Sequence, residues 1–161
     1  MAHKYRIVHD GYLVRYLMKQ YPFGTWRVNV RLGKIKEEVK AGIPLKYAGL
    51  SKLYGMAADS IVFWENKVTI IEALVRPGEW WKIEQLQTYE RAFKVTEEFR
   101  KYWDWPIEKI LLTTEIDEFM ESEAARRGIR VVKFTTPDIE AYKQTIAKRR
   151  AQAFGQALET L

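Results

Sequence analysis

The sequence of 161 residues contains no cysteine, which excludes disulfides, thiolate zinc sites and cysteine nucleophiles. Its two histidines, His3 and His9, are too few and too close to the start to form a histidine metal cage. No apolar run approaches the roughly 18 residues that span a bilayer. The first residues lack the apolar core of a signal peptide. We therefore expect an intracellular, cytoplasmic protein without a membrane segment.

The composition is typical of a folded protein with a basic surface. A hydrophobic content of 47%, with 30% charged and 14% aromatic residues, excludes a disordered chain. The length and the absence of repeats or linkers predict a single domain over residues 1–161. The 27 Lys and Arg against 21 Asp and Glu give a net charge of +6, which favours a polyanionic partner such as DNA. The alternative is a solvated basic surface. The scarcity of asparagine and cysteine resembles thermophile usage.

Hydrophobic periodicity predicts the secondary structure. Helices are expected at residues 7–20, 79–103, 115–128 and 137–161, with a short charged helix at 34–40. Strands are expected at 25–31, 60–64, 67–75, 107–114 and 129–135, and those at 60–64 and 67–75 form a hairpin turning at Glu65-Asn66. Helices connect the later strands, so these pair in parallel. The predicted fold class is α/β, with a mixed β-sheet flanked by helices.

Glu72 is the most informative single residue. It lies within VTIIEALV, a run that is apolar at both parities and is therefore expected to be covered on both faces of the sheet. An ionised carboxylate there costs several kcal/mol unless it is paired, hydrogen-bonded or bound to a metal. The alternatives are a carboxylate paired with a buried Arg or Lys and a functional ligand, of which we favour the second.

Asp59 is expected opposite Glu72. Both residues lie six positions from the turn, one on each limb of the hairpin, and cross-strand neighbours have Cβ atoms roughly 4.5–5.5 Å apart. Two carboxylates at that separation repel each other unless a cation lies between them. Their oxygen atoms suit a hard divalent ion, Mg²⁺ or Mn²⁺. For Asp59 alone, ordinary strand-start chemistry is the alternative.

Asp59, a gap of twelve residues and Glu72-Ala73-Leu74 resemble the PD-(D/E)xK nuclease superfamily, whose fold is restriction-endonuclease-like. In the next helix, Gln85 and Tyr89 resemble the QxxxY motif of the RecB- and Cas4-like branches and share one helix face. The resemblance covers roughly residues 7–135 and implies an αβββαβ core, followed by an extra strand and helix. It further implies that Asp59, Glu72 and the Ala73 carbonyl hold the metal, with Gln85 and Tyr89 beside the site and DNA.

The sequence departs from that family at two positions. Ala58 stands where the family often has proline, and Leu74 stands in place of the family's lysine. That lysine helps to activate the attacking water, so its loss removes an electrostatic contribution to catalysis. Lys82 shares the helix face of Gln85 and Tyr89 and is the best candidate for a displaced lysine. The alternative is an ordinary solvated lysine.

Two further charged residues are candidates for the site. Arg76 shares the strand face of Glu72, although roughly 13 Å away, and we expect it to bind substrate. Asp10 is the nearest match to an acid that the family often carries on a helix ahead of the first strand, whereas Glu37 and Glu38 fit less well. A helix N-cap is the alternative for Asp10.

The leading functional hypothesis is a divalent-metal-dependent DNA nuclease in which Lys82 supplies the missing cation. The alternative is a nuclease-fold protein without catalysis, serving as a DNA-binding accessory or as an assembly component, for example of a virus particle; Leu74 is the argument for it. The basic run at 143–150 tracks phosphates or forms a solvated face. The aromatic content is compatible with a homo-oligomer or a larger assembly, although the sequence locates no interface.

Overall fold

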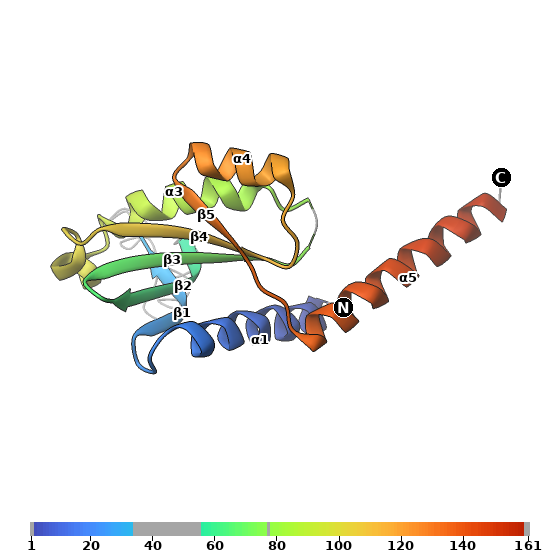
Figure 1. Cartoon of the computed structure of the whole chain (residues 1–161), viewed down its shortest axis with the longest axis horizontal. Helices are drawn as coiled ribbons and strands as arrows, with labels where there is room; N and C mark the ends of the chain where they lie inside the picture. The colour runs from blue at the N-terminus through green and yellow to red at the C-terminus, as the bar shows by residue number, and fades with distance from the viewer. Residues whose placement is uncertain (1, 34–55, 77, 160–161) are drawn as a thin grey trace, which may run out of the picture.

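A five-stranded mixed sheet with the strand order β1-β2-β3-β4-β5 organises the protein (Figure 1). The computed structural model describes residues 2–33, 56–76 and 78–159. The elements are α1 (Ala2–Gln20), β1 (Trp26–Leu32), β2 (Met56–Trp64), β3 (Lys67–Leu74), α3 (Trp81–Phe93), the 3₁₀ helix η2 (Glu97–Tyr102), β4 (Ile107–Thr113), α4 (Glu118–Arg126), β5 (Ile129–Lys133) and α5 (Pro137–Glu159). The order contains the expected αβββαβ core, so the predicted fold class is confirmed.

The sheet changes from antiparallel to parallel pairing at β3. β1, β2 and β3 pair antiparallel, and β3, β4 and β5 pair parallel through the α3 and α4 connections. Glu65 and Asn66 both have φ near 55°, as a two-residue hairpin turn with the twist of the flanking strands requires. The hairpin at these residues is confirmed.

Helices cover both faces of the sheet and create two apolar cores. α3 and α4 lie on one face and α1 lies on the other (Figure 1). Leu86 and Phe93 of α3 pack against Ile70, whereas Tyr12 and Leu17 of α1 belong to the same core as the neighbouring strand residue Ile71. Every residue of β3 from Val68 to Leu74 is consequently buried, which confirms the double coverage expected for this strand. No helix in the described ranges has the length and apolar character that crossing a membrane demands.

The prediction of one long helix at 79–103 is wrong. α3 ends at Phe93 and η2 begins at Glu97. Between them, the Thr96 hydroxyl donates to the Ala92 carbonyl at 2.7 Å and accepts from the Gly33 N–H at 2.8 Å. A side chain that bonds the backbone in this way competes with helical hydrogen bonds. The hydrogen bond from Gly33, next to the end of β1, fixes Thr96 where the helix ends.

The other boundaries differ by a few residues. β2 begins at Met56 rather than 60, because its first residues pair with the end of β1, where Leu32 faces Met56. α4 begins at Glu118, where the Asp117 side chain accepts from the Met120 N–H at 2.9 Å as an N-cap. α1 begins at Ala2 and not at 7. The short helix expected at 34–40 lies outside the described residues.

Candidate active site

The site lies where β2 and β3 separate. Their pairing runs from Trp64–Lys67 to Ser60–Ile71, and Asp59 and Glu72 follow directly after the last pair. Beyond this point β2 stays paired with β1, while β3 stays paired with β4. A fork between two strands leaves backbone N–H groups without a ladder partner, and buried N–H groups need an acceptor.

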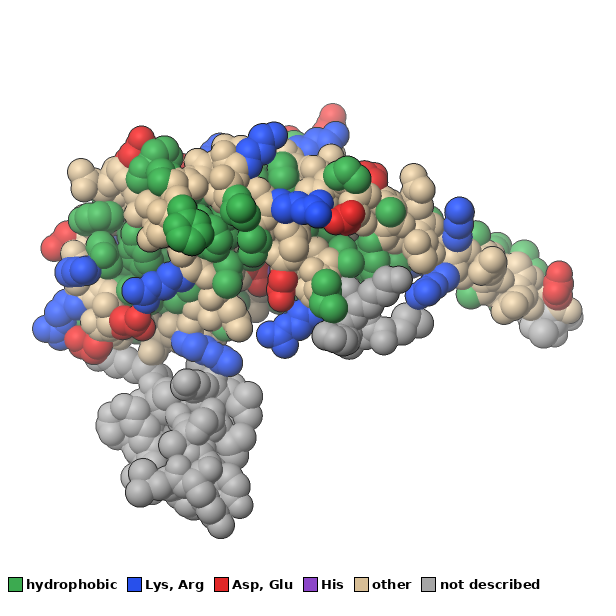
Figure 2. Space-filling model, turned by 90° about the horizontal axis from the view of Figure 1, so that it is seen from below, with side chains coloured by type: hydrophobic (Ala, Val, Ile, Leu, Met, Phe, Trp, Pro, Cys, Tyr) green, Lys and Arg blue, Asp and Glu red, His purple; other side chains and the backbone are tan. Residues whose placement is uncertain are grey.

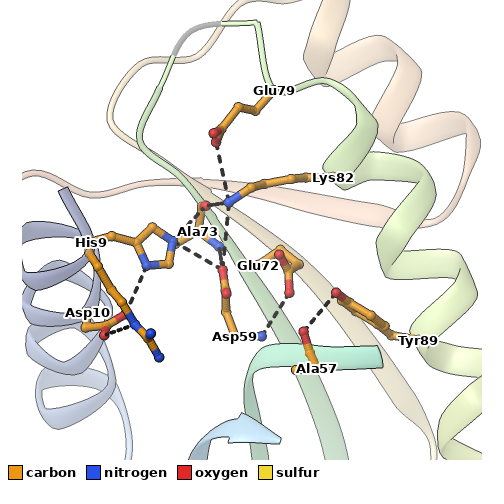
Figure 3. A network of polar contacts seen from close by, with 10 residues as sticks. His9, Asp10, Ala57, Asp59, Glu72, Ala73, Glu79, Lys82 and Tyr89 are labelled. Atoms are coloured by element: carbon orange, nitrogen blue, oxygen red, sulfur yellow. Dashed lines mark hydrogen bonds and ion pairs between the residues drawn. The ribbon is translucent and has the colours of Figure 1, made fainter. Parts of the chain in front are cut away.

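The two carboxylates supply those acceptors (Figure 3). The Asp59 N–H donates to Glu72 Oε1 at 2.9 Å, and the Ala73 N–H donates to Asp59 Oδ2 at 2.9 Å. Each side chain therefore reaches the backbone of the opposite strand. The structure brings Asp59 and Glu72 together as expected, and it places Asp59 inside β2 rather than at its start.

Lys82 reaches the same point from the first turn of α3. Its Nζ donates to the Ala73 carbonyl at 2.5 Å and lies 3.4 Å from Glu79 Oε2 and 3.9 Å from Asp59 Oδ2. The side chain is only 7% exposed, so the solvated-lysine alternative does not hold. The Lys82 ammonium thus lies beside the Ala73 carbonyl and Asp59, two of the groups that we expect from the sequence to hold a metal. The contact between Glu79 and Lys82 was not predicted from the sequence.

His9 of α1 completes the cluster, and sequence reasoning also missed it. Its Nε2 lies 3.3 Å from Asp59 Oδ2 and 3.3 Å from the Ala73 carbonyl oxygen, while Nδ1 lies 3.3 Å from Asp10 Oδ1. Both ring nitrogens face acceptors, an arrangement that only the doubly protonated imidazolium satisfies fully. Its position in the sequence could have indicated burial, because His9 lies four residues before the buried Leu13, on the apolar side of α1. We call His9, Asp59, Glu72, Ala73 and Lys82 the fork site.

Burial and neighbouring charges set the protonation states in the fork site. Burial, and then the charge of Asp59, raise the pKa of Glu72 well above its usual range. Burial opposes ionisation of Asp59, but the hydrogen bond and charge of His9, the charge of Lys82 and the Ala73 N–H outweigh it and lower the pKa of Asp59. Burial alone would lower the pKa of His9, yet the hydrogen bond and charge of Asp59 raise it. Asp59 is therefore the more readily ionised of the two acids, and Glu72 resists ionisation.

The remaining predicted residues lie at varying distances from this cluster. The Tyr89 hydroxyl donates to the Ala57 carbonyl at 2.9 Å and so ties α3 to β2 beside Asp59. Gln85 is half-buried on the same helix, but among the described contacts none joins it to the fork site. Arg76 is exposed and lines a separate cavity beside α5.

Asp10 lies in the middle of α1, so the N-cap alternative is wrong. Its carboxylate contacts His9 and lies 3.8 Å from Arg6 Nε. Glu37 and Glu38 lie outside the described residues.

A cavity of about 250 Å³ opens beside the fork site, between α1 and β1. Asn29, whose φ is 53°, lies in the wall of this cavity. In β1, Val28 pairs with Ser60 and Val30 pairs with Ala58, so Asn29 lies opposite Asp59 on β2. The cavity provides access to Asp59 from the α1 side, and it is lined by Arg6, His9, Asp10, Leu13, Val14, Val28, Asn29 and Asp59.

The oxygen atoms of the fork site suit a hard cation. Asp59, Glu72 and the Ala73 carbonyl present oxygen atoms, the ligands that Mg²⁺ and Mn²⁺ prefer. Among the described residues, no three His, Asp or Glu side chains form a ready-made metal cage. A divalent ion would use the two strand carboxylates and the carbonyl and would displace the Lys82 ammonium from Ala73. The residues therefore fit a metal with few protein ligands.

Comparisons with known proteins place few constraints on this site. No family model and no curated protein matches the chain. Among solved structures, the chain is similar to the small subunit of the heterodimeric restriction endonuclease R.BspD6I, with a TM-score of 0.39 and 16% sequence identity over 87% of this chain and 67% of that chain. The functional interpretation accordingly depends on the contacts of the fork site.

Proposed function

We propose that the protein is a divalent-metal-dependent nuclease that acts on DNA, with Mg²⁺ or Mn²⁺ held by Asp59, Glu72 and the Ala73 carbonyl. The observation that carries the proposal is the meeting of the buried Glu72, the half-buried Asp59 and the buried Lys82 at the strand fork. Burying an acid whose charge is disfavoured weakens the fold. A bound cation would offset that cost, which gives these residues a reason to lie together.

The metal would supply an activated water and polarise the scissile phosphate. The chain's own residues prepare that step. His9 and the Ala73 N–H favour the ionised form of Asp59, so it offers a negatively charged ligand. Lys82, once displaced from the Ala73 carbonyl, would place its positive charge beside the phosphate, where negative charge develops during hydrolysis. In this proposal Lys82, which enters from α3, takes the role of the lysine that the sequence lacks at Leu74.

The surroundings favour a nucleic-acid substrate. The net charge of the chain is +6, which attracts a polyanion. At the cavity beside Asp59, the Arg6 side chain is 73% exposed and provides a cation that can contact a phosphate next to the scissile one. DNA rather than a small phosphate ester is the expected substrate, because an excess of cationic side chains favours a polyanion.

The test is cleavage of single-stranded, duplex and branched DNA in the presence and absence of Mg²⁺ or Mn²⁺. We expect metal-dependent cleavage by the native chain, and its loss in Glu72→Gln. Glu121→Gln, a change of the same chemistry on the exposed surface of α4, is the control and should remain active. Cleavage that continues in Glu72→Gln, or that needs no metal, contradicts the proposal.

A second candidate is a nuclease-fold protein that binds DNA or takes part in an assembly without cutting. Two observations favour it: Leu74 packs in the core on the α3 side, and the Lys82 ammonium already lies among the metal-ligand oxygens. A Leu74→Lys variant separates the candidates. An inert native protein that gains cleavage from this change supports the second, whereas an active native protein excludes it.

A further inference from the structure

Another cavity lies on the α1 face of the sheet, at the end of β3 away from the fork site. Its volume is about 410 Å³, and its walls come from the end of α1, the turn between β2 and β3, and the strands β4 and β5. Lys67 in its wall precedes Glu72 by five residues of β3, which is roughly 16 Å along the strand. We call it the hairpin cavity; the argument uses Lys19, Tyr21, Trp64, Lys67, Glu108 and Arg130 of its wall.

One part of the hairpin cavity is aromatic. The ring centroids of Tyr16 and Tyr21 lie 6.3 Å apart and those of Tyr21 and Trp64 lie 5.9 Å apart, both pairs edge to face. Phe134 continues this set, with its ring 5.4 Å from that of Tyr16. Trp64 is nevertheless 37% exposed. Aromatic side chains that are held in place and remain accessible suit stacking with a flat ring, above all with a nucleobase.

The cations of the hairpin cavity are arranged around Glu108. Lys67 of β3 and Arg130 of β5 flank Glu108 of β4, the strand between them. Lys67 Nζ donates to Glu108 Oε2 at 3.3 Å, and Arg130 Nη2 donates to Glu108 Oε1 at 3.1 Å. An ammonium has three donors and a guanidinium has five, and these side chains are 41% and 59% exposed. Glu108 therefore fixes two cations side by side and leaves further donors for a ligand.

Lys19 adds a third cation from the last turn of α1. Its Nζ lies 5.9 Å from the centre of the Phe134 ring, a distance at which a cation is attracted by the ring. The basic residues in the wall of the cavity outnumber its acids, Glu65 and Glu108. Figure 2 views the protein from the α1 side, and at the end away from α5 hydrophobic side chains lie beside basic and acidic ones.

This combination distinguishes the hairpin cavity from the two cavities described above. The cavity beside Asp59 has no Phe, Tyr or Trp in its wall. The cavity beside α5 has basic residues, but Tyr142 is its only aromatic residue in the described part of the chain. Accessible rings and cations around one space call for a ligand that carries both a flat ring and a negative charge.

We propose that the hairpin cavity binds a phosphorylated nucleoside, with its base against the aromatic residues and its phosphate among the three cations. The volume of about 410 Å³ is within the range of small-ligand sites, about 300–1,000 Å³. An inorganic anion would leave the rings uncovered, and a neutral aromatic compound would leave the cations without a partner. A free nucleotide and the phosphorylated end of a DNA strand present the same chemistry. The site uses no metal and does not depend on the nuclease proposal.

The first test is binding of the four deoxynucleoside 5′-monophosphates to the full chain, measured by calorimetry in EDTA so that the fork site holds no metal. We expect them to bind, because stacking tolerates any base. Inorganic phosphate should bind about ten-fold more weakly, since it lacks the contribution of one stacked base. Deoxyadenosine, which has no phosphate, should also bind more weakly than its monophosphate. Absence of binding by all four monophosphates, or equal binding of inorganic phosphate, overturns the proposal.

Variants of the cavity wall locate the ligand. Trp64→Leu should weaken binding of the monophosphates about ten-fold, the contribution of one stacked base. Trp81→Leu, a change at an exposed tryptophan of α3 on the other face of the sheet, is its control and should bind like the native chain. Lys19→Gln should weaken binding of the monophosphates but not of deoxyadenosine. Lys94→Gln, at the exposed end of α3, is the matched control. Unchanged binding in Trp64→Leu or in Lys19→Gln overturns the proposal.

Short oligothymidylates with and without a 5′-phosphate separate the two sources of the ligand. If the cavity holds a strand end, the phosphorylated oligonucleotide binds more tightly than thymidine 5′-monophosphate and than the unphosphorylated oligonucleotide, and Trp64→Leu weakens it. If the cavity holds a free nucleotide, thymidine 5′-monophosphate binds most tightly of the three. Both results support the site. A chain that binds the two oligonucleotides equally, with no effect of Trp64→Leu, and binds no monophosphate uses another surface for DNA, and that result overturns the proposal.

Discussion

The backbone N–H of Asp59 donates a 2.9 Å hydrogen bond to Glu72 Oε1 at the point where β2 leaves β3. In return, Asp59 Oδ2 accepts from the residue after Glu72. The two acids thus end the strand ladder with the Glu72 carboxylate buried and the Asp59 carboxylate beside it half-buried. This arrangement makes Glu72 costly to ionise, because burial and the charge of Asp59 raise its pKa.

Raising the pH should destabilise the protein through Glu72. Burial and the charge of Asp59 raise the pKa of Glu72 in the folded state. The folded chain therefore holds this proton more tightly than the unfolded chain, and the stability gained from it is present at low pH and is lost as the pH rises through the raised pKa. Glu72→Gln cannot ionise, so its stability should fall less over the same range.

Urea denaturation of both proteins at pH 5 and pH 8, without divalent metal, measures this difference. The comparison isolates Glu72, because His9 and Asp59 remain in both chains. Parallel changes in the free energy of unfolding of the two proteins would show that Glu72 titrates normally.

His9 should stabilise the fold mainly as an imidazolium. Its pKa is raised in the folded state by the hydrogen bond and charge of Asp59, which outweigh burial. The stabilisation is therefore complete below the unfolded pKa and is lost as the pH rises through the folded pKa. We expect His9→Ala to cost about 1.5–3 kcal/mol at pH 5.5, the range for a hydrogen bond to a charged group, and clearly less at pH 9.

NMR titration of the imidazole resonances checks the pKa of His9 directly. The chain has only two histidines, so a His3→Ala variant assigns the signals. A His9 pKa below 6.5 would contradict the ion pair with Asp59.

Much of this structure could be predicted from the sequence, because its signals are local. The hairpin turning at Glu65-Asn66 fixes the register, and the register brings Asp59 and Glu72 together by counting alone. The apolar run around Glu72 indicated burial from both sides. Lys82 was found because it is separated from Gln85 by one helical turn, a spacing that is readable without a structure.

The residues that sequence reasoning missed come from other elements. His9 joins the site from α1, 50 positions before Asp59, and only the packing of α1 on the sheet brings the two together. Glu79 precedes α3, and its contact with Lys82 depends on the path of the chain into that helix. The end of α3 at Phe93 was not predicted, because it depends on the hydrogen bond between the Gly33 N–H, next to the end of β1, and the Thr96 hydroxyl.

Removing the Lys82 ammonium should make the fork site more receptive to metal. Lys82→Met leaves the Ala73 carbonyl without its ammonium donor and Asp59 without a nearby cation, so the metal-free protein should lose about 1–3 kcal/mol, the cost of a buried hydrogen-bonding group left without its partner. Mn²⁺ would then meet no competing cation, and it should raise the melting temperature of Lys82→Met more than that of the native chain.

Melting curves with and without Mn²⁺ measure both effects. Lys148→Met, a change at an exposed lysine of α5, is the control and should behave like the native chain. If Mn²⁺ affects Lys82→Met and the native chain equally, Lys82 and the metal do not share the oxygens of Asp59 and Ala73.

The central claim is that Asp59 and Glu72 bind a divalent cation, and the melting temperature of the native chain against that of Glu72→Gln, each with and without Mn²⁺, tests it most directly. A cation that binds only the folded state raises the melting temperature by mass action. We predict a rise with Mn²⁺ in the native chain and none in Glu72→Gln, with the metal-free variant at least as stable as the native chain at neutral pH because glutamine has no charged form whose burial is costly. A native chain that is insensitive to Mn²⁺, together with a destabilised Glu72→Gln, would show instead that Glu72 is only the counter-charge of the buried lysine.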